Sequence, residues 1–148
     1  MQKRPLSLSL PMPAERVIPH RPPMQLVDRL TACDPGSGSG TVETRVPGNG
    51  LFTAAGGRLD PTALFEMIAQ AYAAVKGYGN LVRGLPVRGG YLVGIRAGRV
   101  RESAAAGDRL EIDVRTERSF GDFSVARGTV ARAGREIASA VIKVWSPP

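Results

Sequence analysis

Cysteine, histidine, aromatic side chains and long apolar runs are all scarce in this 148-residue chain, and each shortage excludes a class of protein. The single cysteine, Cys33, excludes an intramolecular disulfide framework and any zinc site built from several cysteines. We interpret Cys33 as a free thiol, as expected in a reducing compartment. No window reaches the apolar length of a membrane span, so we expect a soluble, cytoplasmic protein.

Aromatic residues make up only 5% of the chain, although its formal net charge is +7. The arginines are scattered, and the sequence contains no basic block and no basic motif interleaved with aromatic residues. We therefore predict that the basic surface does not bind nucleic acid. An acidic protein or a phosphate-bearing ligand is the kind of partner that this charge favours.

The first residues, MQKRPLSLSLPMPAER, superficially resemble a signal peptide, because basic residues precede leucines. The apolar run is short, interrupted by serines and closed by prolines, and no small-residue cleavage pattern follows. We interpret residues 1–15 as a flexible N-terminal arm. The remaining length suits one domain, and the 43% of apolar residues suffices for its core, so residues 16–148 are predicted to form a single domain.

Several segments alternate between apolar and polar residues, as the strands of an antiparallel sheet with one solvated face do. The clearest example is the segment in which Leu110, Ile112 and Val114 alternate with charged residues. The last segment, IASAVIKVW, is apolar on both faces, which favours a central or interface strand. The patterns predict strands at residues 24–31, 41–46, 91–96, 109–118, 123–132 and 137–145.

One long helix is predicted in the segment LDPTALFEMIAQAYAAVKG. Asp60 is a suitable N-cap, Pro61 occupies the favoured first helical position, and Gly77 supplies a C-terminal stop. Apolar residues cover nearly every direction around the axis, which indicates a helix buried on all sides. Glu66 and Gln70 interrupt that surface four residues apart, and therefore on one face. The predicted fold class is α+β, with an antiparallel sheet wrapped around one long buried helix.

Four motifs occur in order along the chain: PH-x-x-PM-x-L-x-D from Pro19, E-x-x-AQAYAA from Glu66, GYLVG from Gly90 and AGDRL from Ala106. In this order and spacing the chain resembles the hot-dog-fold 3-hydroxyacyl-[acyl carrier protein] dehydratases over roughly residues 16–146. Within them it is most similar to the aryl-polyene-type branch. The resemblance implies a hot-dog fold and dehydration of acyl thioesters.

The chain departs from the fatty-acid enzymes of that family at one motif. Those enzymes carry their catalytic histidine in a GHFPG-type loop shortly before the helix, whereas the corresponding segment here, LFTAAGGRLDP, contains no histidine. The helix carboxylate, Glu66, does match the family pattern. The only histidine of the chain, His20, comes from a different segment.

Glu66 and His20 are the candidate catalytic residues. A carboxylate on an otherwise buried helix is costly unless it is paired or functional, so Glu66 is the candidate general acid. His20 is the only side chain that offers a neutral base, and prolines on both sides of it provide a rigid setting. The alternatives are a solvated Glu66 on a narrow exposed stripe and a His20 that serves only in packing or hydrogen bonding.

Further candidates surround this pair. Gln70 is a candidate to orient Glu66 or to bind a substrate oxygen, and the alternative is a partly exposed helix residue without such a role. Gly90 and Tyr91 are candidates to line the acyl site. The alternatives are that Gly90 only forms a turn and that Tyr91 belongs to the core. Three arginines are candidates to contact an acidic carrier protein or the phosphate of its pantetheine arm, although solvated strand faces explain them equally well: Arg96, Arg99 and Arg101.

Our first hypothesis is a homodimeric, or higher even-numbered, hot-dog dehydratase of the kind that serves fatty-acid or aryl-polyene-like lipid biosynthesis. It would act on 3-hydroxyacyl thioesters held by acyl carrier protein through phosphopantetheine, without a metal or another cofactor. Two alternatives keep the fold. One is a hot-dog acyl thioesterase that uses Glu66 and does not require His20. The other is a non-catalytic module that binds acyl groups or the carrier protein.

Overall fold

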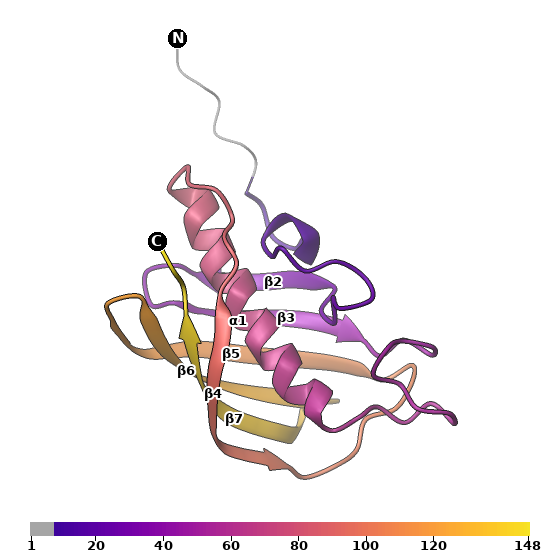
Figure 1. Cartoon of the computed structure of the whole chain (residues 1–148). Helices are drawn as coiled ribbons and strands as arrows, with labels where there is room; N and C mark the ends of the chain where they lie inside the picture. The colour runs from indigo at the N-terminus through magenta and orange to yellow at the C-terminus, as the bar shows by residue number, and fades with distance from the viewer. Residues whose placement is uncertain (1–7) are drawn as a thin grey trace.

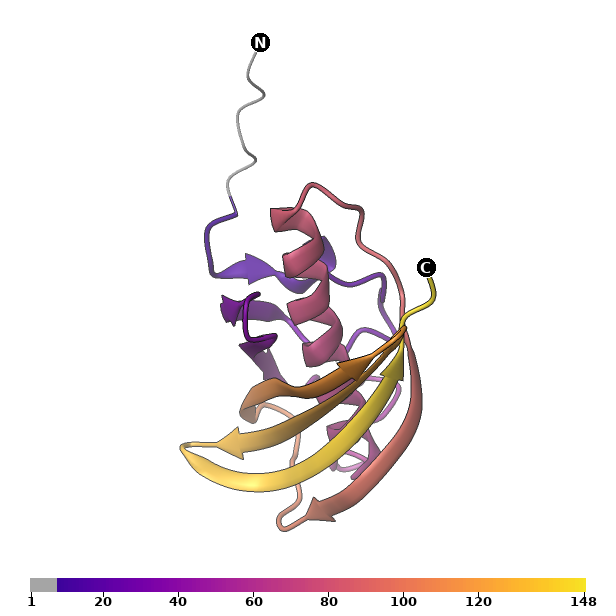
Figure 2. The same cartoon turned by 90° about the vertical axis from the view of Figure 1, so that its left-hand side faces the viewer.

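The computed structural model describes residues 8–148, in which one long helix lies against a curved antiparallel sheet (Figure 1). The view rotated by 90° shows that the sheet curls around the helix (Figure 2). The α+β class is confirmed. The elements are β1 Met12–Pro13, the 3-10 helix Ala14–Arg16, β2 Arg29–Asp34, β3 Ser39–Arg45, α1 Thr62–Val82, β4 Tyr91–Val100, β5 Arg109–Phe120, β6 Phe123–Arg132 and β7 Arg135–Trp145.

All seven strands of this sheet pair antiparallel, in the order β1-β2-β3-β5-β6-β7-β4. Residues that are directly opposite each other in the register share a face. One such row runs across β5, β6, β7 and β4 and is entirely aromatic: Phe120, Phe123, Trp145 and Tyr91. This row fixes the beginning of β4, and with it Tyr91, at one end of the sheet.

The period-two patterns identify the sheet correctly along most of its length. Leu110, Ile112 and Val114 of β5 are buried, and the charged residues between them face away from α1. The strand predicted at residues 123–132 coincides with β6, and the doubly apolar last segment is β7, which lies between β6 and β4. The central position of β7 explains why its residues are apolar on both faces.

The first predicted strand is displaced. The strand β2 covers Arg29–Asp34, whereas the apolar run predicted a strand at residues 24–31. Residues before β2 form polar contacts with other segments instead of a ladder: the Leu26 N–H donates to the Gln70 side chain at 2.8 Å, and the Asp28 carboxylate accepts the Arg45 N–H at 2.8 Å. Leu26 is buried in the core, so burial rather than strand structure accounts for the apolar pattern.

The helix α1 begins at Thr62, one residue after the predicted first helical position Pro61, and it ends later than predicted. The Asp60 carboxylate accepts the Thr62 N–H at 2.9 Å, which satisfies a donor of the first turn. Gly77 does not end the helix, which continues to Val82. A Cβ atom at Gly77 would overlap the carbonyl oxygen of Val17, so this glycine permits close approach of two backbones. The prediction of a stop at Gly77 is wrong, because the glycine serves packing rather than helix termination.

The segment predicted as a flexible arm lies partly outside the described residues, which begin at Leu8. Of its described part, Met12–Pro13 pairs with β2, and both Met12 and Ala14 are buried in the core. Residues 12–15 therefore pack against the same core as the residues that follow, whereas the sequence predicted them to be part of a flexible arm. Within the described residues, no helix combines the length and the hydropathy needed to cross a membrane.

Candidate active site

A cavity of about 180 Å³ lies between α1, the loop before β2 and the adjoining ends of β4 and β7. Its wall on the helix side is a single stripe, because Glu66, Ala69, Ala73 and Lys76 are spaced three, four and three residues apart. The two alanines leave the space open, and Glu66 is the only acidic residue in the lining. His20, Gly90 and Tyr91 line the same cavity.

His20 and Glu66, distant in sequence, therefore meet at one site. Gln70 holds the segment that follows His20 against α1: its amide oxygen accepts the Leu26 N–H at 2.8 Å, and its NH₂ group donates to the Met24 carbonyl at 2.8 Å. The same NH₂ group donates to Glu66 Oε1 at 3.1 Å. Gln70 is fully buried, and these contacts occupy both N–H donors, so the arrangement suits positioning of Glu66 rather than substrate binding.

The imidazole of His20 is half-buried and unusually free. Nδ1 is inaccessible to solvent and has no hydrogen-bond partner within residues 8–148. A histidine that serves as structural support normally has its buried nitrogen satisfied. An imidazole without a structural partner, on the wall of a cavity that also contains a carboxylate, can exchange protons with a bound molecule.

Gly90 and Tyr91 form the opposite rim of the cavity. A Cβ atom at Gly90 would lie 3.1 Å from Val144 Cγ1 and 3.2 Å from Ser146 Oγ, so the absence of a side chain matters there. Tyr91 is 60% exposed and its ring lies 5.6 Å from that of Trp145, centroid to centroid. Tyr91 is therefore exposed at the cavity rim, and it is not the core tyrosine that was the alternative prediction.

The three arginines predicted to contact the carrier protein lie elsewhere. None of Arg96, Arg99 and Arg101 lines the cavity, and Arg101 forms an ion pair with Glu136 at 3.3 Å. The basic residues that do line the cavity are Lys76 and Arg88, which sequence reasoning missed. Lys76 could have been found from its spacing on the Glu66 stripe, but Arg88 lies in a loop without a periodic signal.

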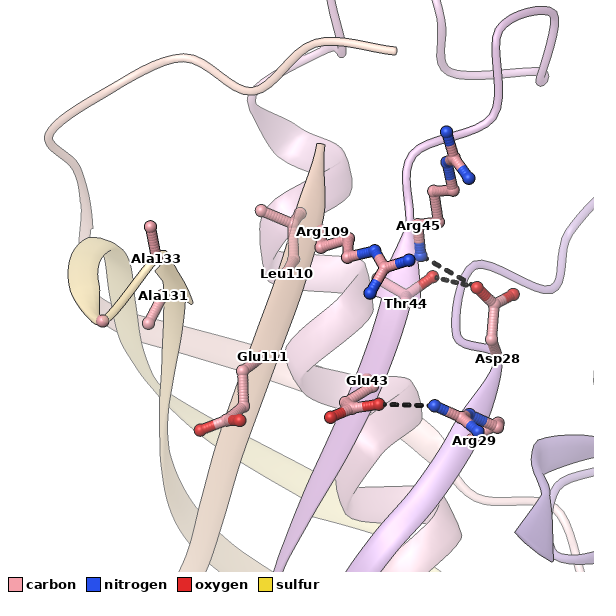
Figure 3. A pocket seen from close by; sticks show the side chains of 11 residues that line it. Asp28, Arg29, Glu43, Thr44, Arg45, Arg109, Leu110, Glu111, Ala131 and Ala133 are labelled. Carbon is pink, nitrogen blue, oxygen red and sulfur yellow. Dashed lines mark hydrogen bonds and ion pairs between the residues drawn. The ribbon is translucent and has the colours of Figure 1, made fainter. Parts of the chain in front are cut away.

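A larger hollow of about 470 Å³ lies over β2, β3 and β5 (Figure 3). Much of its charge is internally paired: Arg29 bonds Glu43 at 2.8 Å, and Asp28 accepts hydrogen bonds from Thr44 and Arg45. Glu43 faces away from α1, because the neighbouring Val42 and Thr44 are buried. This hollow contains no histidine, and we assign no chemistry to it.

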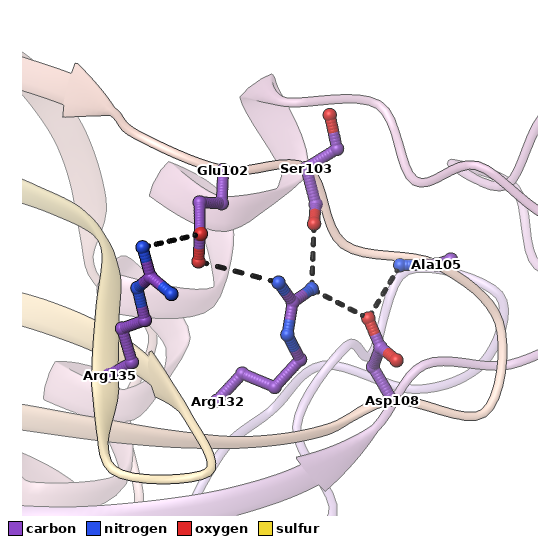
Figure 4. Close-up of polar contacts among 6 residues, drawn as sticks. All are labelled: Glu102, Ser103, Ala105, Asp108, Arg132 and Arg135. Atoms are coloured by element: carbon purple, nitrogen blue, oxygen red, sulfur yellow. Dashed lines mark hydrogen bonds and ion pairs between the residues drawn. The ribbon is translucent and has the colours of Figure 1, made fainter.

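A charged cluster supports the loop between β4 and β5 (Figure 4). Arg132 donates to the Ser103 carbonyl at 2.7 Å and to Asp108 Oδ2 at 2.9 Å, and its other terminal nitrogen lies 3.4 Å from Glu102. Asp108 also accepts the Ala105 N–H at 2.9 Å. The AGD part of the AGDRL motif therefore has a structural role, because the cluster fixes the turn that leads into β5.

Other reactive groups lie apart from the cavity. Burial and, to a smaller extent, the Asp34 carboxylate raise the pKa of the Cys33 thiol to about 11. In the described residues no group of three histidine, cysteine, aspartate or glutamate side chains is arranged to hold a metal ion. The glycine pair at 56 and 57 forms a turn, with both residues at positive φ, and does not line the cavity.

Comparison with known proteins identifies relatives along almost the whole chain. Residues 12–148 match the family model described as ApeP-like, ApeP dehydratase. A 3-hydroxyacyl-[acyl-carrier-protein] dehydratase FabZ from Anaeromyxobacter sp. (strain Fw109-5) is 32% identical over 131 residues, which are 85% of this chain and 82% of that protein. The FabZ of Anaeromyxobacter sp. (strain K) is 27% identical over 129 residues, with 85% and 83% covered.

Solved structures share the fold. The dehydratase heterocomplex ApeI:P from Xenorhabdus doucetiae contains a chain that matches with a TM-score of 0.85 at 22% identity, over 93% of this chain and 92% of that one. A hypothetical thioesterase from Streptococcus pneumoniae TIGR4, solved with coenzyme A, matches with a TM-score of 0.58 at 16% identity, over 75% and 80%. The hot-dog architecture implied by the motifs is confirmed.

Proposed function

We propose, from the premise that this chain belongs to the ApeP-like dehydratase family, that it removes water from 3-hydroxyacyl thioesters carried by an acyl carrier protein. The observation that carries the proposal is the cavity that brings His20 and Glu66 together. The FabZ relatives, whose name specifies the 3-hydroxyacyl-[acyl-carrier-protein] substrate, support the choice of thioester. The comparisons support a place in fatty-acid or aryl-polyene-like lipid biosynthesis.

In this proposal His20 is the base and Glu66 the acid. A ring nitrogen of His20 removes the proton from the carbon next to the thioester carbonyl. Glu66 donates a proton to the hydroxyl on the following carbon, and that carbon–oxygen bond breaks as water leaves. The electron pair of the broken C–H bond becomes the new double bond, so the atoms balance without an oxidant or reductant.

Charge that develops on the thioester oxygen needs a hydrogen-bond donor. We assign this role to backbone N–H groups at the Gly90 rim, because Gly90 lines the cavity that also contains Glu66 and His20. Gln70 supports the reaction indirectly, through its hydrogen bond to Glu66 and its two bonds to the segment after His20.

The carrier protein and a second subunit are the proposed macromolecular partners. The net charge of +7 favours an acidic carrier, and Arg96, Arg99 and Arg101 remain candidates for contacts with it. The family architecture and the exposed apolar edge strand β4 favour a homodimer. The heterocomplex reported for the Xenorhabdus relative makes a different dehydratase subunit a second candidate for the same position.

A panel of thioesters tests the proposed function. The purified chain is incubated with 3-hydroxyacyl, enoyl and saturated acyl thioesters, and products are identified by mass spectrometry. Interconversion of the first two, without release of free thiol, is the expected result. Thiol release from the saturated thioester would instead establish a thioesterase, and binding without turnover would establish an acyl-binding module.

A further inference from the structure

The cavity lining contains two kinds of ionisable side chain. Besides Glu66 and His20 it includes Lys76 and Arg88, two cations. Neither Lys76 nor Arg88 forms an ion pair within residues 8–148, although six arginine–carboxylate contacts join other residues of that part of the chain. Two unpaired cations in one cavity favour an anionic group of a ligand.

The Lys76 side chain is directed into the cavity wall rather than away from it. Its ammonium group lies 5.5 Å from the centroid of the Tyr72 ring, and Tyr72 also lines the cavity. The Tyr72 ring is itself held in place, because its hydroxyl is 2.8 Å from Thr116 Oγ1 and the residue is fully buried. A fixed aromatic face thus holds the cation near a site where an anion can reach it.

The distance between Glu66 and Lys76 along α1 suits one particular ligand. Glu66 and Lys76 are ten residues apart on α1, which corresponds to a rise of about 15 Å along the helix axis. A phosphopantetheine arm has about thirteen bonds between its sulfur and its phosphorus, as many as roughly four residues of extended backbone, or about 14 Å. An arm whose thioester lies at Glu66 therefore extends its phosphate to the level of Lys76.

We propose that Lys76 and Arg88 bind the phosphate of the pantetheine arm and so fix the direction in which the substrate enters: phosphate at the Lys76 end of α1, reacting carbons at Glu66. This inference rests on the proposed function, because it takes the substrate to be a pantetheine thioester. It makes both cations specificity residues, which select phosphorylated carriers and do not take part in proton transfer.

The test compares two substrates that differ only in the phosphate. A 3-hydroxyacyl-phosphopantetheine and the corresponding 3-hydroxyacyl-pantetheine are assayed with the wild-type chain and with Lys76→Gln, Arg88→Gln and the double variant. We expect the double variant to lose on the order of 10-fold or more in kcat/KM for the phosphorylated substrate, mostly through KM. The unphosphorylated substrate should change by less than about 2-fold.

Arg45→Gln is the matched control, because it also removes an exposed arginine but lies in β3, outside this cavity. It should leave both substrates unchanged. Equal losses on both substrates in the Lys76 and Arg88 variants would overturn the inference, since the cations would then act on the catalytic pair. Equal turnover of both substrates by the wild-type chain and all variants would also overturn it, while leaving the dehydratase proposal intact.

A binding measurement separates the two proposals if no turnover occurs. Trp145, the only tryptophan of the sequence, packs with a tilted ring against Tyr91 at the cavity rim, so its fluorescence reports on that rim. Tighter binding of phosphopantetheine than of pantetheine, lost in the double variant, would support the phosphate site even for a chain that does not dehydrate. Equal binding of both compounds would reject it.

Discussion

At the scale of single residues, the proposed function depends on a histidine for which the structure shows no supporting hydrogen bond at its buried nitrogen. His20 is half-buried, and its Nδ1 has no partner in the described part of the chain. Glu66, in contrast, is linked to the fold through Gln70. The proposed proton-transfer pair thus combines a base without a supporting hydrogen bond at Nδ1 and an acid positioned by Gln70.

His20→Ala and Glu66→Gln should each slow dehydration by on the order of 10²–10⁴-fold, the usual contribution of a positioned proton-transfer group. Steady-state kinetics on a 3-hydroxyacyl thioester measures this. The double variant should lose less than the product of the two single losses if both groups act on one transition state.

Thermal unfolding serves as the control for both variants. His20→Ala should melt close to the wild type, because the buried Nδ1 of its ring makes no hydrogen bond within residues 8–148, and Glu66→Gln keeps an oxygen that can accept from Gln70. A His20→Ala variant that fails to fold would show that the imidazole is structural. Full activity of that variant, together with an inactive Glu66→Gln, would favour the thioesterase mechanism.

Cys33 should be nearly inert near neutral pH. Its pKa is raised to about 11, whereas an unperturbed thiol has a pKa of about 8.5, so the reactive thiolate at pH 8 is reduced by on the order of 10²-fold. Alkylation by iodoacetamide, followed by mass spectrometry, should accelerate steadily between pH 8 and pH 11. A rate at pH 8 equal to that of the urea-unfolded chain would contradict the assignment.

The raised pKa of Cys33 also makes the fold less stable at alkaline pH. The fold favours the neutral thiol, so its stabilising contribution is fully present below the pKa of the unfolded thiol and is lost as the pH rises towards 11. Cys33→Ser should weaken this alkaline loss.

At the scale of elements, two glycines of α1 that look equivalent in the sequence should behave in opposite ways. Gly77→Ala places a methyl group on the Val17 carbonyl and should destabilise the fold by about 2–3 kcal/mol or more. Gly79→Ala has only Pro35 Cβ within 4 Å, at 3.8 Å, and should stabilise the helix by about 0.5–1 kcal/mol. Chemical denaturation of both variants measures the difference, and equal effects would refute the packing role of Gly77.

Gly77 shows where prediction of the strands and the helix from the sequence succeeds and where it fails. Alternation identified β5 and β6, and a run apolar on both faces identified β7, because each of these strands has neighbours on both sides and a buried face towards α1. The helix end was missed because the reason for Gly77 is the backbone of Val17, sixty residues earlier. No local sequence pattern predicts a contact between residues that are sixty positions apart.

The site was predictable only in part for the same reason. Glu66 stood out as a carboxylate on an apolar helix, and His20 as the only histidine. Their shared cavity follows from Gln70, whose side chain bonds the Met24 and Leu26 backbones more than forty residues away. Arg88 could not be predicted, because a loop arginine is ordinary until the fold brings it to a cavity.

At the scale of the whole molecule, β4 is an unprotected edge of the sheet. It is ten residues long, pairs only with β7 among the described residues, and exposes apolar side chains along its length: Tyr91, Leu92, Val93, Ile95 and Val100. A long apolar edge strand is a template for association with another chain. One layer of sheet over one helix is also a modest core for a stable monomer. We therefore expect β4 to be covered in the working protein.

The carrier protein imposes a second requirement at this scale. If an acidic carrier delivers the substrate to a chain of net charge +7, added salt should lower kcat/KM for the carrier-bound thioester, because screening slows association. The corresponding pantetheine thioester, assayed in parallel, should respond much less. Equal salt sensitivity of both substrates would remove the electrostatic argument for the carrier protein.

Oligomerisation through β4 gives the last prediction. Sedimentation velocity should show a dimer at micromolar concentration, and Val93→Lys combined with Ile95→Lys should shift it towards monomer and lower the melting temperature. Charges on an exposed edge oppose strand pairing, whereas the same charge elsewhere does not. Leu51→Lys is the control, since Leu51 is 61% exposed but lies in the loop before α1. A wild-type chain that stays monomeric, folded and active at this concentration would contradict the dimer. A monomer that dimerises only with a different hot-dog subunit would instead assign the β4 edge to a heterologous partner.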